Sequence, residues 1–258
     1  MLPPVLGYVI GFALLAVLVL LLYVLWKVRA VHLKVYDVMD AVRQTQDRDL
    51  VNHFQQSQLV RILEHELDLD RPLPALRGWA ASPDFLLVIT RHARDRRPKI
   101  VVECSSGVST IVLARVAQLN GQGHVYSLEH DPVFGAQTRQ ELHARGLAEW
   151  ATVIDAPLTE HRIDGDAWPW YSLENLPVDE IDQIVIDGPP YSVGPLARYP
   201  AGPLLFGKVR EDGAAFLDDA DRVEETEISE RWVRELSGWK MNTEYCEKGC
   251  RRFTRRGD

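Results

Sequence analysis

The residues best placed to do chemistry stand at the ends of short apolar runs. The run from Ile100 ends in Glu103, and a turn of small residues, Cys104-Ser105-Ser106-Gly107, follows it. Small side chains at such a turn let a ligand approach the backbone, and a helix that starts there offers free N–H groups. A second run ends in Glu129, where a carboxylate can accept hydrogen bonds from both hydroxyls of a ribose. This order of features predicts a binding site for an adenosine-containing cofactor.

A third apolar run ends in Asp187, and Asp218 and Asp219 follow a further predicted strand. The carboxyl ends of parallel strands lie at one edge of a sheet, where open α/β folds bind ligands, so these acids are expected close together. Two interpretations stay open. Either the three carboxylates hold a hard divalent cation such as Mg²⁺ through oxygen, or Asp187 alone acts as a base or orienter. In the second case Asp218 and Asp219 cap the next helix or pair with Arg222.

The elements that must position these residues predict an α/β fold beyond Pro98. Apolar strands that alternate with helices indicate a doubly wound, Rossmann-like, mostly parallel sheet covered on both faces. Strands are expected over Ile100–Glu103, His124–Leu128, Ala151–Ile154, Ile181–Ile186 and Ala214–Leu217. Helices are expected over Trp79–His92, Thr110–Asn120, Val133–Arg145, Leu196–Val209 and Arg222–Leu236. A final antiparallel hairpin at the sheet edge is expected from Trp239–Tyr245, a Glu247-Lys248-Gly249 turn and Arg251–Thr254.

The first part of the chain predicts a transmembrane helix. Val5–Trp26 contains no charged residue, and a helix of this length reaches about 33 Å against a hydrocarbon core of about 30 Å. A cleaved signal peptide would need a basic start and a shorter apolar stretch, which the sequence does not show. Lys27, Arg29 and Lys34 follow the run and no basic residue precedes it. Positive residues stay on the cytoplasmic side, so we expect a single-pass membrane protein whose catalytic domain faces the cytoplasm.

The next segment, from Val28 to about Leu69, predicts a helix. Val28, Val31, Val35, Val38 and Val42 lie at heptad-like spacing over roughly two heptads. Either the helix pairs two chains into a homodimer, or it packs on its own domain, and the short repeat favours packing. We therefore expect an anchor at 1–27, a helical linker at 28–70 and one globular domain at 71–258.

Composition excludes several classes of protein. The chain has 258 residues and a formal net charge of −8, which gives no global basic field for nucleic acid. Its 3 cysteines are too few for a disulfide framework and are expected to be reduced. Nicotinamide dehydrogenases need Gly-x-Gly-x-x-Gly after the first strand, whereas this chain has Ser105, Gly107 and Thr110 at those positions.

Five motifs in order give the chain from about Leu73 onward a family resemblance. The motifs are Glu103-Cys104-Ser105-Ser106-Gly107-Val108-Ser109-Thr110, Ser127-Leu128-Glu129-His130-Asp131, Val153-Ile154-Asp155-Ala156-Pro157-Leu158, Ile186-Asp187-Gly188-Pro189-Pro190 with Arg198-Tyr199-Pro200-Ala201, and Phe216-Leu217-Asp218-Asp219-Ala220-Asp221-Arg222. The chain resembles class I S-adenosylmethionine-dependent methyltransferases, most closely a bacterial group whose first motif reads Glu-x-Gly-Ser-Gly-x-Ser-Thr. Ser105 stands at the first glycine of that motif, where a side chain fits easily only if its φ is negative.

The resemblance implies S-adenosylmethionine as cofactor and O-methylation of a small-molecule or glycan hydroxyl as the reaction. Asp187 is the expected catalytic residue, and metal-dependent O-methyltransferases of this fold use acids at comparable strand ends. Cofactor contacts are expected from Glu103, Ser105, Ser106, Gly107, Ser109, Thr110, Glu129, Asp155 and Ala156. Acceptor contacts are expected from Trp170, Tyr171, Tyr191, Arg198 and Tyr199. The alternative is a membrane-tethered scaffold that kept the fold and lost activity.

Overall fold

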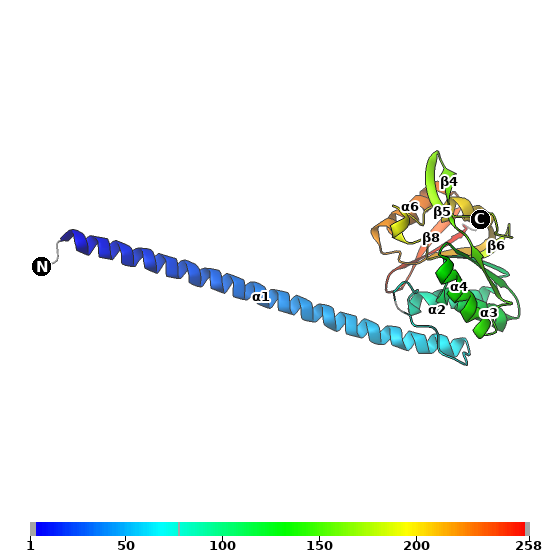
Figure 1. Ribbon diagram of the computed structural model, residues 1–258, viewed down its shortest axis with the longest axis horizontal. Helices are drawn as coiled ribbons and strands as arrows, with labels where there is room; N and C mark the ends of the chain where they lie inside the picture. The colour runs from blue at the N-terminus through cyan, green and yellow to red at the C-terminus, as the bar shows by residue number, and fades with distance from the viewer. Residues whose placement is uncertain (1–3, 77, 256–258) are drawn as a thin grey trace. The chain divides into compact units, whose positions relative to one another are not determined.

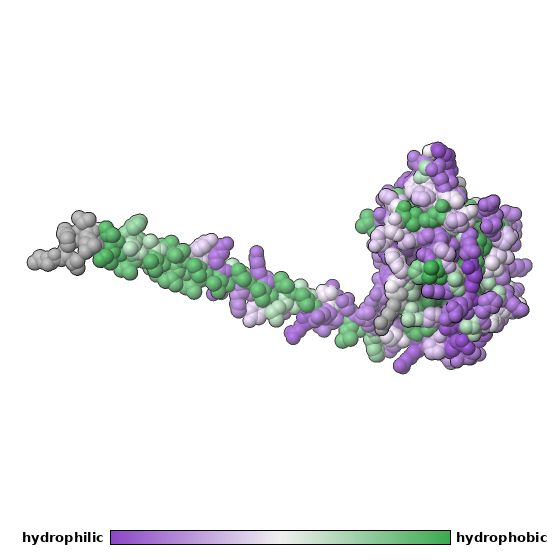
Figure 2. Space-filling model, in the orientation of Figure 1, coloured by the Kyte–Doolittle hydropathy of each residue, from purple (hydrophilic) through white to green (hydrophobic). Residues whose placement is uncertain are grey.

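The chain divides into two units, Met1–Gln55 and Gln56–Asp258, and the computed structural model describes residues 4–76 and 78–255 of it. The first unit is the greater part of helix α1 (Pro4–Glu66). Figure 2 shows a continuous apolar surface along the first half of α1, where Leu14 and Leu22 expose 66% and 58% of their surface. By length and composition, α1 is apolar enough to cross a membrane.

The predicted linker helix is part of the same α1, which runs through it without a break and ends at Glu66. Within the first unit α1 is the whole structure, so its side chains have no second element to pack against. The valines at heptad-like spacing are therefore exposed, from 49% at Val35 to 61% at Val38.

The second unit, drawn as a ribbon in Figure 1, is built on a seven-stranded sheet with the order β3-β2-β1-β6-β7-β9-β8. The strands are β1 (Ile100–Cys104), β2 (His124–Glu129), β3 (Ala151–Asp155), β6 (Ile181–Ile186), β7 (Val209–Leu217), β8 (Trp239–Glu244) and β9 (Cys250–Arg255). β3, β2, β1, β6 and β7 are parallel to their neighbours, whereas β9 runs antiparallel to both β7 and β8. The predicted α/β fold class with a C-terminal hairpin is confirmed.

Helices cover both faces of this sheet. They are α2 (Pro83–Arg96), α3 (Val108–Asn120), α4 (Pro132–Ala144), α5 (Ala201–Leu205) and α6 (Val223–Glu235), with short 3₁₀ turns η1 (Tyr191–Val193) and η2 (Phe206–Lys208). Successive residues of a strand point to opposite faces, so Val101 packs in a cluster with residues of α2 and α3. Val102 packs in a second cluster with residues of α5 and α6. Apolar runs without alternation are the expected sequence of such a doubly covered sheet.

Two predicted helices differ from the structure, and one hairpin was not predicted. The helix expected over Leu196–Val209 is wrong, because Pro200, Gly202 and Pro203 limit it to the short α5 and η2. The helix expected over Trp79–His92 starts later, at Pro83, with Ser82 in extended backbone angles at its N-cap. The hairpin that was not predicted consists of β4 (Leu158–Ile163) and β5 (Asp166–Tyr171).

The end of α1 belongs to the second unit and to its core. Leu63 of α1 and Leu67, directly after α1, are fully buried and pack in the same cluster as Phe85 of α2. The Gln56 side chain donates from Nε2 to Asp84 Oδ2 at 2.9 Å, which joins the same two helices. The division between units therefore lies inside the segment that the sequence assigns to the linker at 28–70.

Candidate active site

A cavity of about 810 Å³ opens at the carboxyl ends of the parallel strands. Open α/β sheets bind ligands at this edge. The predicted site residues that line it are Ser105, Ser106, Gly107, Ser109, Glu129, Tyr171, Asp187, Arg198, Asp218 and Asp219. One continuous cavity thus contains the predicted cofactor turn, the predicted ribose acid and the three acids at neighbouring strand ends.

The turn after β1 brings backbone to the cavity wall in an unusual conformation. Ser105 has φ 147° and Gly107 has φ 143°, in a region that residues with a side chain rarely adopt. Ser105 therefore lacks the negative φ at which a serine side chain fits this turn without strain. The Ser105 hydroxyl is buried and has no hydrogen-bond partner among the described residues. A strained turn with an unsatisfied hydroxyl faces the space where a cofactor is expected.

Glu103 supports this turn from beneath and does not line the cavity. Its side chain is fully buried, and Oε2 accepts hydrogen bonds from Thr110 Oγ1 at 2.6 Å and Ser127 Oγ at 2.7 Å. The Gly107 N–H donates to Thr110 Oγ1 at 3.0 Å. Burial raises the pKa of the Glu103 carboxyl to about 7, although the hydroxyl hydrogen bonds act in the opposite direction. Glu103 and Thr110, both predicted to contact the cofactor, do not line the cavity, and their hydrogen-bond network fixes the turn that does.

Glu129 lies at the end of β2 with its carboxylate on the cavity. Its Oε2 accepts from Ser106 Oγ at 2.7 Å, and its Oε1 accepts from the Asp131 N–H at 2.9 Å. These two bonds hold the carboxylate against the turn. They also hold it at the position predicted for a ribose contact.

Asp155 and Ala156 do not line the cavity, contrary to expectation. Asp155 pairs with Arg139 of α4, which keeps its carboxylate at the outer surface with 72% of the side chain exposed. Ala156 is buried in the core. Asp155 ends β3 and Ala156 follows it, and β3 is at the edge of the sheet, one position beyond β2.

The acids of the fourth and fifth predicted motifs come together as expected. Oxygen atoms of Asp187, Asp218 and Asp219 lie within 4.8 Å of one another. Arg198, predicted to contact the acceptor, lies among them. Its Nη2 is 3.2 Å from Asp187 Oδ1 and 3.0 Å from Asp219 Oδ2, and its Nη1 donates to the Asp218 carbonyl at 2.9 Å. The cluster therefore already contains a cation.

Burial dominates the electrostatics of this cluster. It raises the pKa of the Asp187 carboxyl to about 6, against the attraction of Arg198. Burial, reinforced by the neighbouring Asp187, also raises the pKa of Asp218 well above its usual value. Arg222 contacts Asp219 Oδ2 from the surface at 3.0 Å, as one of the sequence interpretations predicts. Asp187 consequently changes its charge close to neutral pH.

The acceptor residues predicted from the aromatic segment divide into two groups. Tyr171 lines the cavity, but Trp170 and Tyr199 are fully buried in the core and do not. Trp170 lies in β5, the hairpin strand missed at the sequence level, which directs the side chain into the core. Tyr199 Oη donates to Glu235 Oε2 of α6 at 2.7 Å. Tyr191 is 65% exposed, and its ring lies 6.2 Å from that of Trp79.

The comparisons with known proteins identify the domain. The family model of a methyltransferase domain matches residues 102–220. The chain carries a methyltransferase domain. No curated protein sequence matches the chain.

Solved structures share its fold at low sequence identity. The S-adenosylhomocysteine-bound methyltransferase PaMTH1 of Podospora anserina has a TM-score of 0.56 at 14% identity, over 82% of this chain and 96% of that one. An O-methyltransferase of Bacillus cereus in complex with S-adenosylhomocysteine has a TM-score of 0.50 at 13% identity, over 78% and 90%. A methyltransferase of Geobacter sulfurreducens has a TM-score of 0.51 at 15% identity, over 77% and 89%. These likenesses establish the fold of the methyltransferase domain.

Several residues that line the cavity escaped the sequence analysis as site residues. Trp79 comes from the segment before α2, His130 and Phe134 flank the start of α4, and Lys248 comes from the turn between β8 and β9. The Nδ1 atom of His130 lies 3.3 Å from Glu129 Oε1. Its position directly after the ribose acid was a usable signal. Trp79 and Lys248 carried none, since only the folded chain brings their segments to this edge.

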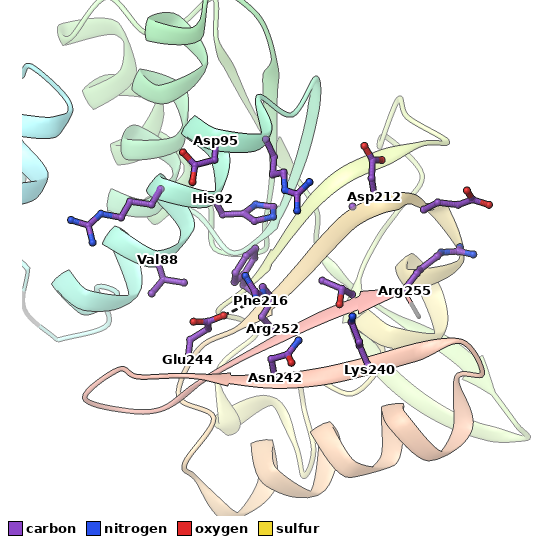
Figure 3. Close-up of a pocket in the computed structure, with 15 residues that line it drawn as sticks. Val88, His92, Asp95, Asp212, Phe216, Lys240, Asn242, Glu244, Arg252 and Arg255 are labelled. Carbon is purple, nitrogen blue, oxygen red and sulfur yellow. Dashed lines mark ion pairs between the residues drawn. The ribbon is translucent and has the colours of Figure 1, made fainter. Parts of the chain in front are cut away.

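A second hollow of about 800 Å³ lies between α2 and the strands β7, β8 and β9. Figure 3 shows His92 of α2 pointing toward Phe216, with Glu244 and Arg252 paired below them. None of the predicted site residues lines it. Its charges are of both signs, and the Arg252 and Glu244 side chains neutralise each other at 3.1 Å. The cavity at the carboxyl edge is therefore the candidate active site of the methyltransferase domain.

Proposed function

We propose that this chain is a membrane-anchored S-adenosylmethionine-dependent O-methyltransferase that acts on a small-molecule or glycan hydroxyl. The observation that carries the proposal is one cavity with the β1 turn and Glu129 on one side and Asp187 on the other. The methyltransferase family match over residues 102–220 supports the reaction class. S-adenosylmethionine, when bound, supplies a methyl group on a sulfonium that is ready for direct displacement.

The residues of the turn suit this cofactor. Glu129 presents a carboxylate, which can accept hydrogen bonds from a ribose diol. The Ser105 hydroxyl is buried at the cavity wall without a partner, and a buried polar group is satisfied when a ligand supplies one. Ser106 and Ser109 line the same wall. Together these groups would hold the adenosine and the amino-acid portions of the cofactor.

Asp187 supplies the base in this proposal. Methyl transfer needs alignment of the two reacting atoms and an acceptor oxygen that loses its proton. A carboxylate with a pKa near 6 is largely ionised at neutral pH, yet basic enough to take a proton from a well-oriented hydroxyl. Arg198 holds Oδ1 of this carboxylate at 3.2 Å, so the base has a fixed orientation at the cavity wall.

The acceptor would enter past Trp79 and Tyr191. Both rings are about two-thirds exposed, 66% and 65%, their centroids lie 6.2 Å apart, and Trp79 lines the cavity. Exposed aromatic pairs offer a flat apolar surface to a ring or a sugar face. This placement supports a hydroxylated ring compound or glycan as the acceptor.

The apolar first half of α1 supports the membrane anchor in this proposal. The cations Lys27, Arg29 and Lys34 after it support a domain that faces the cytoplasm. The exposed valine stripe of α1 supports pairing of two chains along the helix, because apolar side chains at heptad spacing are buried when such helices associate. Chemical crosslinking of the full chain in native membranes tests this pairing, and a single monomer band at every crosslinker dose would contradict it.

One observation favours the alternative, an inactive tethered scaffold. The strained Ser105 stands where the motif has glycine and crowds the ligand side of the turn. Calorimetric titration of the full chain in detergent with S-adenosylmethionine distinguishes the two functions. We expect micromolar binding that Glu129→Ala abolishes and that Glu230→Ala, on the exposed face of α6, leaves unchanged. Absence of binding by a folded wild-type chain would favour the scaffold, and wild-type affinity in Glu129→Ala would refute the ribose contact.

A further inference from the structure

We infer that Arg198 takes the place of a divalent metal ion in the Asp187, Asp218 and Asp219 cluster, so that the site works without one. Arg198 and the three acids form this cluster whatever reaction the site performs. Metal-independent methyl transfer, the consequence of the replacement, rests on the proposed function. Three carboxylates at neighbouring strand ends are the usual ligands of a hard cation. In this chain the positive charge among them is a side chain.

The guanidinium of Arg198 uses its donors on the groups that a metal would need. Nη2 donates to Asp187 Oδ1 at 3.2 Å, to Asp219 Oδ2 at 3.0 Å and to the Asp187 carbonyl at 3.1 Å. Nη1 donates to the Asp218 carbonyl at 2.9 Å. Nε lies 3.7 Å from Glu225 Oε1. A planar fork that is satisfied on several sides is the arrangement in which arginine, unlike lysine, binds carboxylates firmly.

Burial requires the charges of Arg198 and the acids to remain paired. The side chain of Arg198 is 5% exposed, and those of Asp219 and Glu225 are 6% and 7% exposed. Buried charges must be paired, because each one unpaired would lose its hydration without compensation. Arg198 is thus an internal counterion and not a surface side chain that visits the cluster.

The backbone around Arg198 keeps it in place. It stands in the segment between η1 and α5, where the Leu196 N–H donates to Glu224 Oε2 at 2.9 Å and the Tyr199 N–H donates to the Leu196 carbonyl at 2.8 Å. Its neighbours Ala197 and Tyr199 are buried. Removal of the guanidinium would require this packed segment to move.

The guanidinium opposes a second cation in this cluster. Arg198 is bound to Asp187 Oδ1 and Asp219 Oδ2, and Asp218 Oδ1 accepts from the Asp219 N–H at 2.8 Å. A divalent ion on the remaining carboxylate oxygens would lie next to the positive charge of Arg198 and would be repelled by it. The residues present therefore fit a guanidinium and do not fit a divalent ion.

Titration with Mn²⁺, followed by electron paramagnetic resonance of the free ion, tests the inference on the full chain in detergent. We expect the wild type to bind no Mn²⁺ up to about 1 mM, the weak end of all-oxygen sites. Arg198→Met leaves the acids without their counterion. This variant is expected to melt at a lower temperature and to gain one Mn²⁺ site with a dissociation constant below about 0.1 mM.

Two controls make the result specific. Arg198→Lys keeps the charge and is expected to bind no Mn²⁺, while Asp219→Asn combined with Arg198→Met is expected to lose the gained site. Stoichiometric Mn²⁺ binding by the wild type that Asp219→Asn removes would overturn the inference. So would a folded Arg198→Met chain that binds no Mn²⁺. If Arg198→Met folds only in the presence of Mn²⁺, the replacement is supported. S-adenosylmethionine binding, measured on the same samples, reports on the proposed function separately.

Discussion

Replacing Ser105 by glycine is expected to stabilise the methyltransferase domain, which is unusual for a substitution next to a binding site. The residue has φ 147°, and a non-glycine residue in a sparsely populated region costs about 1–3 kcal/mol. Its buried hydroxyl without a partner costs about 1–3 kcal/mol more. Glycine also gives the unfolded chain more conformational freedom, which offsets about 0.5–1 kcal/mol of this stabilisation. The net expected stabilisation is at least about 1 kcal/mol.

Thermal unfolding of the full chain in detergent measures this effect. A change of 1 kcal/mol corresponds to about 2–4 °C in a domain of this size. Ser105→Ala separates the two contributions, because it removes the hydroxyl and keeps the side chain that strains the backbone. It should therefore give only part of the increase. Ser106→Gly is the matched control and should destabilise, since its hydroxyl donates to Glu129 at 2.7 Å.

A Ser105→Gly chain that melts at or below the wild-type temperature would refute the strain argument. Equal gains from Ser105→Ala and Ser105→Gly would assign the whole effect to the buried hydroxyl. Calorimetry on the same variants shows whether the strain serves cofactor binding. Because the proposed function gives the unpartnered Ser105 hydroxyl to the cofactor, Ser105→Gly is expected to bind S-adenosylmethionine more weakly than the wild type.

Three further outcomes follow from the structure. Asp187→Asn should lower the methyl-transfer rate by about 10²- to 10⁴-fold. The wild-type rate should rise with pH through about 6, where Asp187 loses its proton. A wild-type rate that does not depend on pH would show that Asp187 is not the base. Because burial raises the folded pKa of Glu103 from 4.5 to about 7, wild-type stability should fall as pH rises through that window. Glu103→Gln should flatten this dependence in chemical denaturation at several pH values, and an unchanged slope would contradict it. Leu67→Ala should lower the free energy of unfolding by about 2–5 kcal/mol. Leu50 is 70% exposed, so Leu50→Ala should lower it by less than about 0.5 kcal/mol. Similar losses for both variants would show that Leu67 is not part of the core.

The sheet could be predicted because its local signals agree with one another. Each parallel strand is a short apolar run bounded by turn residues, and the predicted Ile181–Ile186 matches β6 at both ends. The hairpin of β4 and β5 was missed although its turn, Asp164-Gly165, has positive φ at both residues. Asp-Gly is a strong hairpin signal, but the alternating pattern around it contains few apolar residues. The turn signal is therefore present in the sequence, but the strands on either side of it lack the apolar alternation that marks a strand.

The site could be predicted only as far as strand ends determine it. Glu129, Asp187 and the pair of aspartates reach the cavity because parallel strands end at one edge. The position of Arg198 depends on packing of the segment before α5, which no periodicity in the sequence describes. Trp170 and Tyr199 are of residue types that often form binding surfaces, yet both are core residues. Large aromatic side chains serve both purposes, so the distinction requires the fold.

The position of β9 has a consequence for biosynthesis. β9 is the last strand of the sheet in chain order, yet it lies between β7 and β8. Until the ribosome has released Cys250–Arg255, β7 therefore has an unpaired edge, and β8 has no neighbour in the sheet. Unpaired edges recruit other strands, and domains of this size expose such surfaces while they fold. A chain without Cys250–Arg255 would carry an almost complete site on a sheet that is open to aggregation.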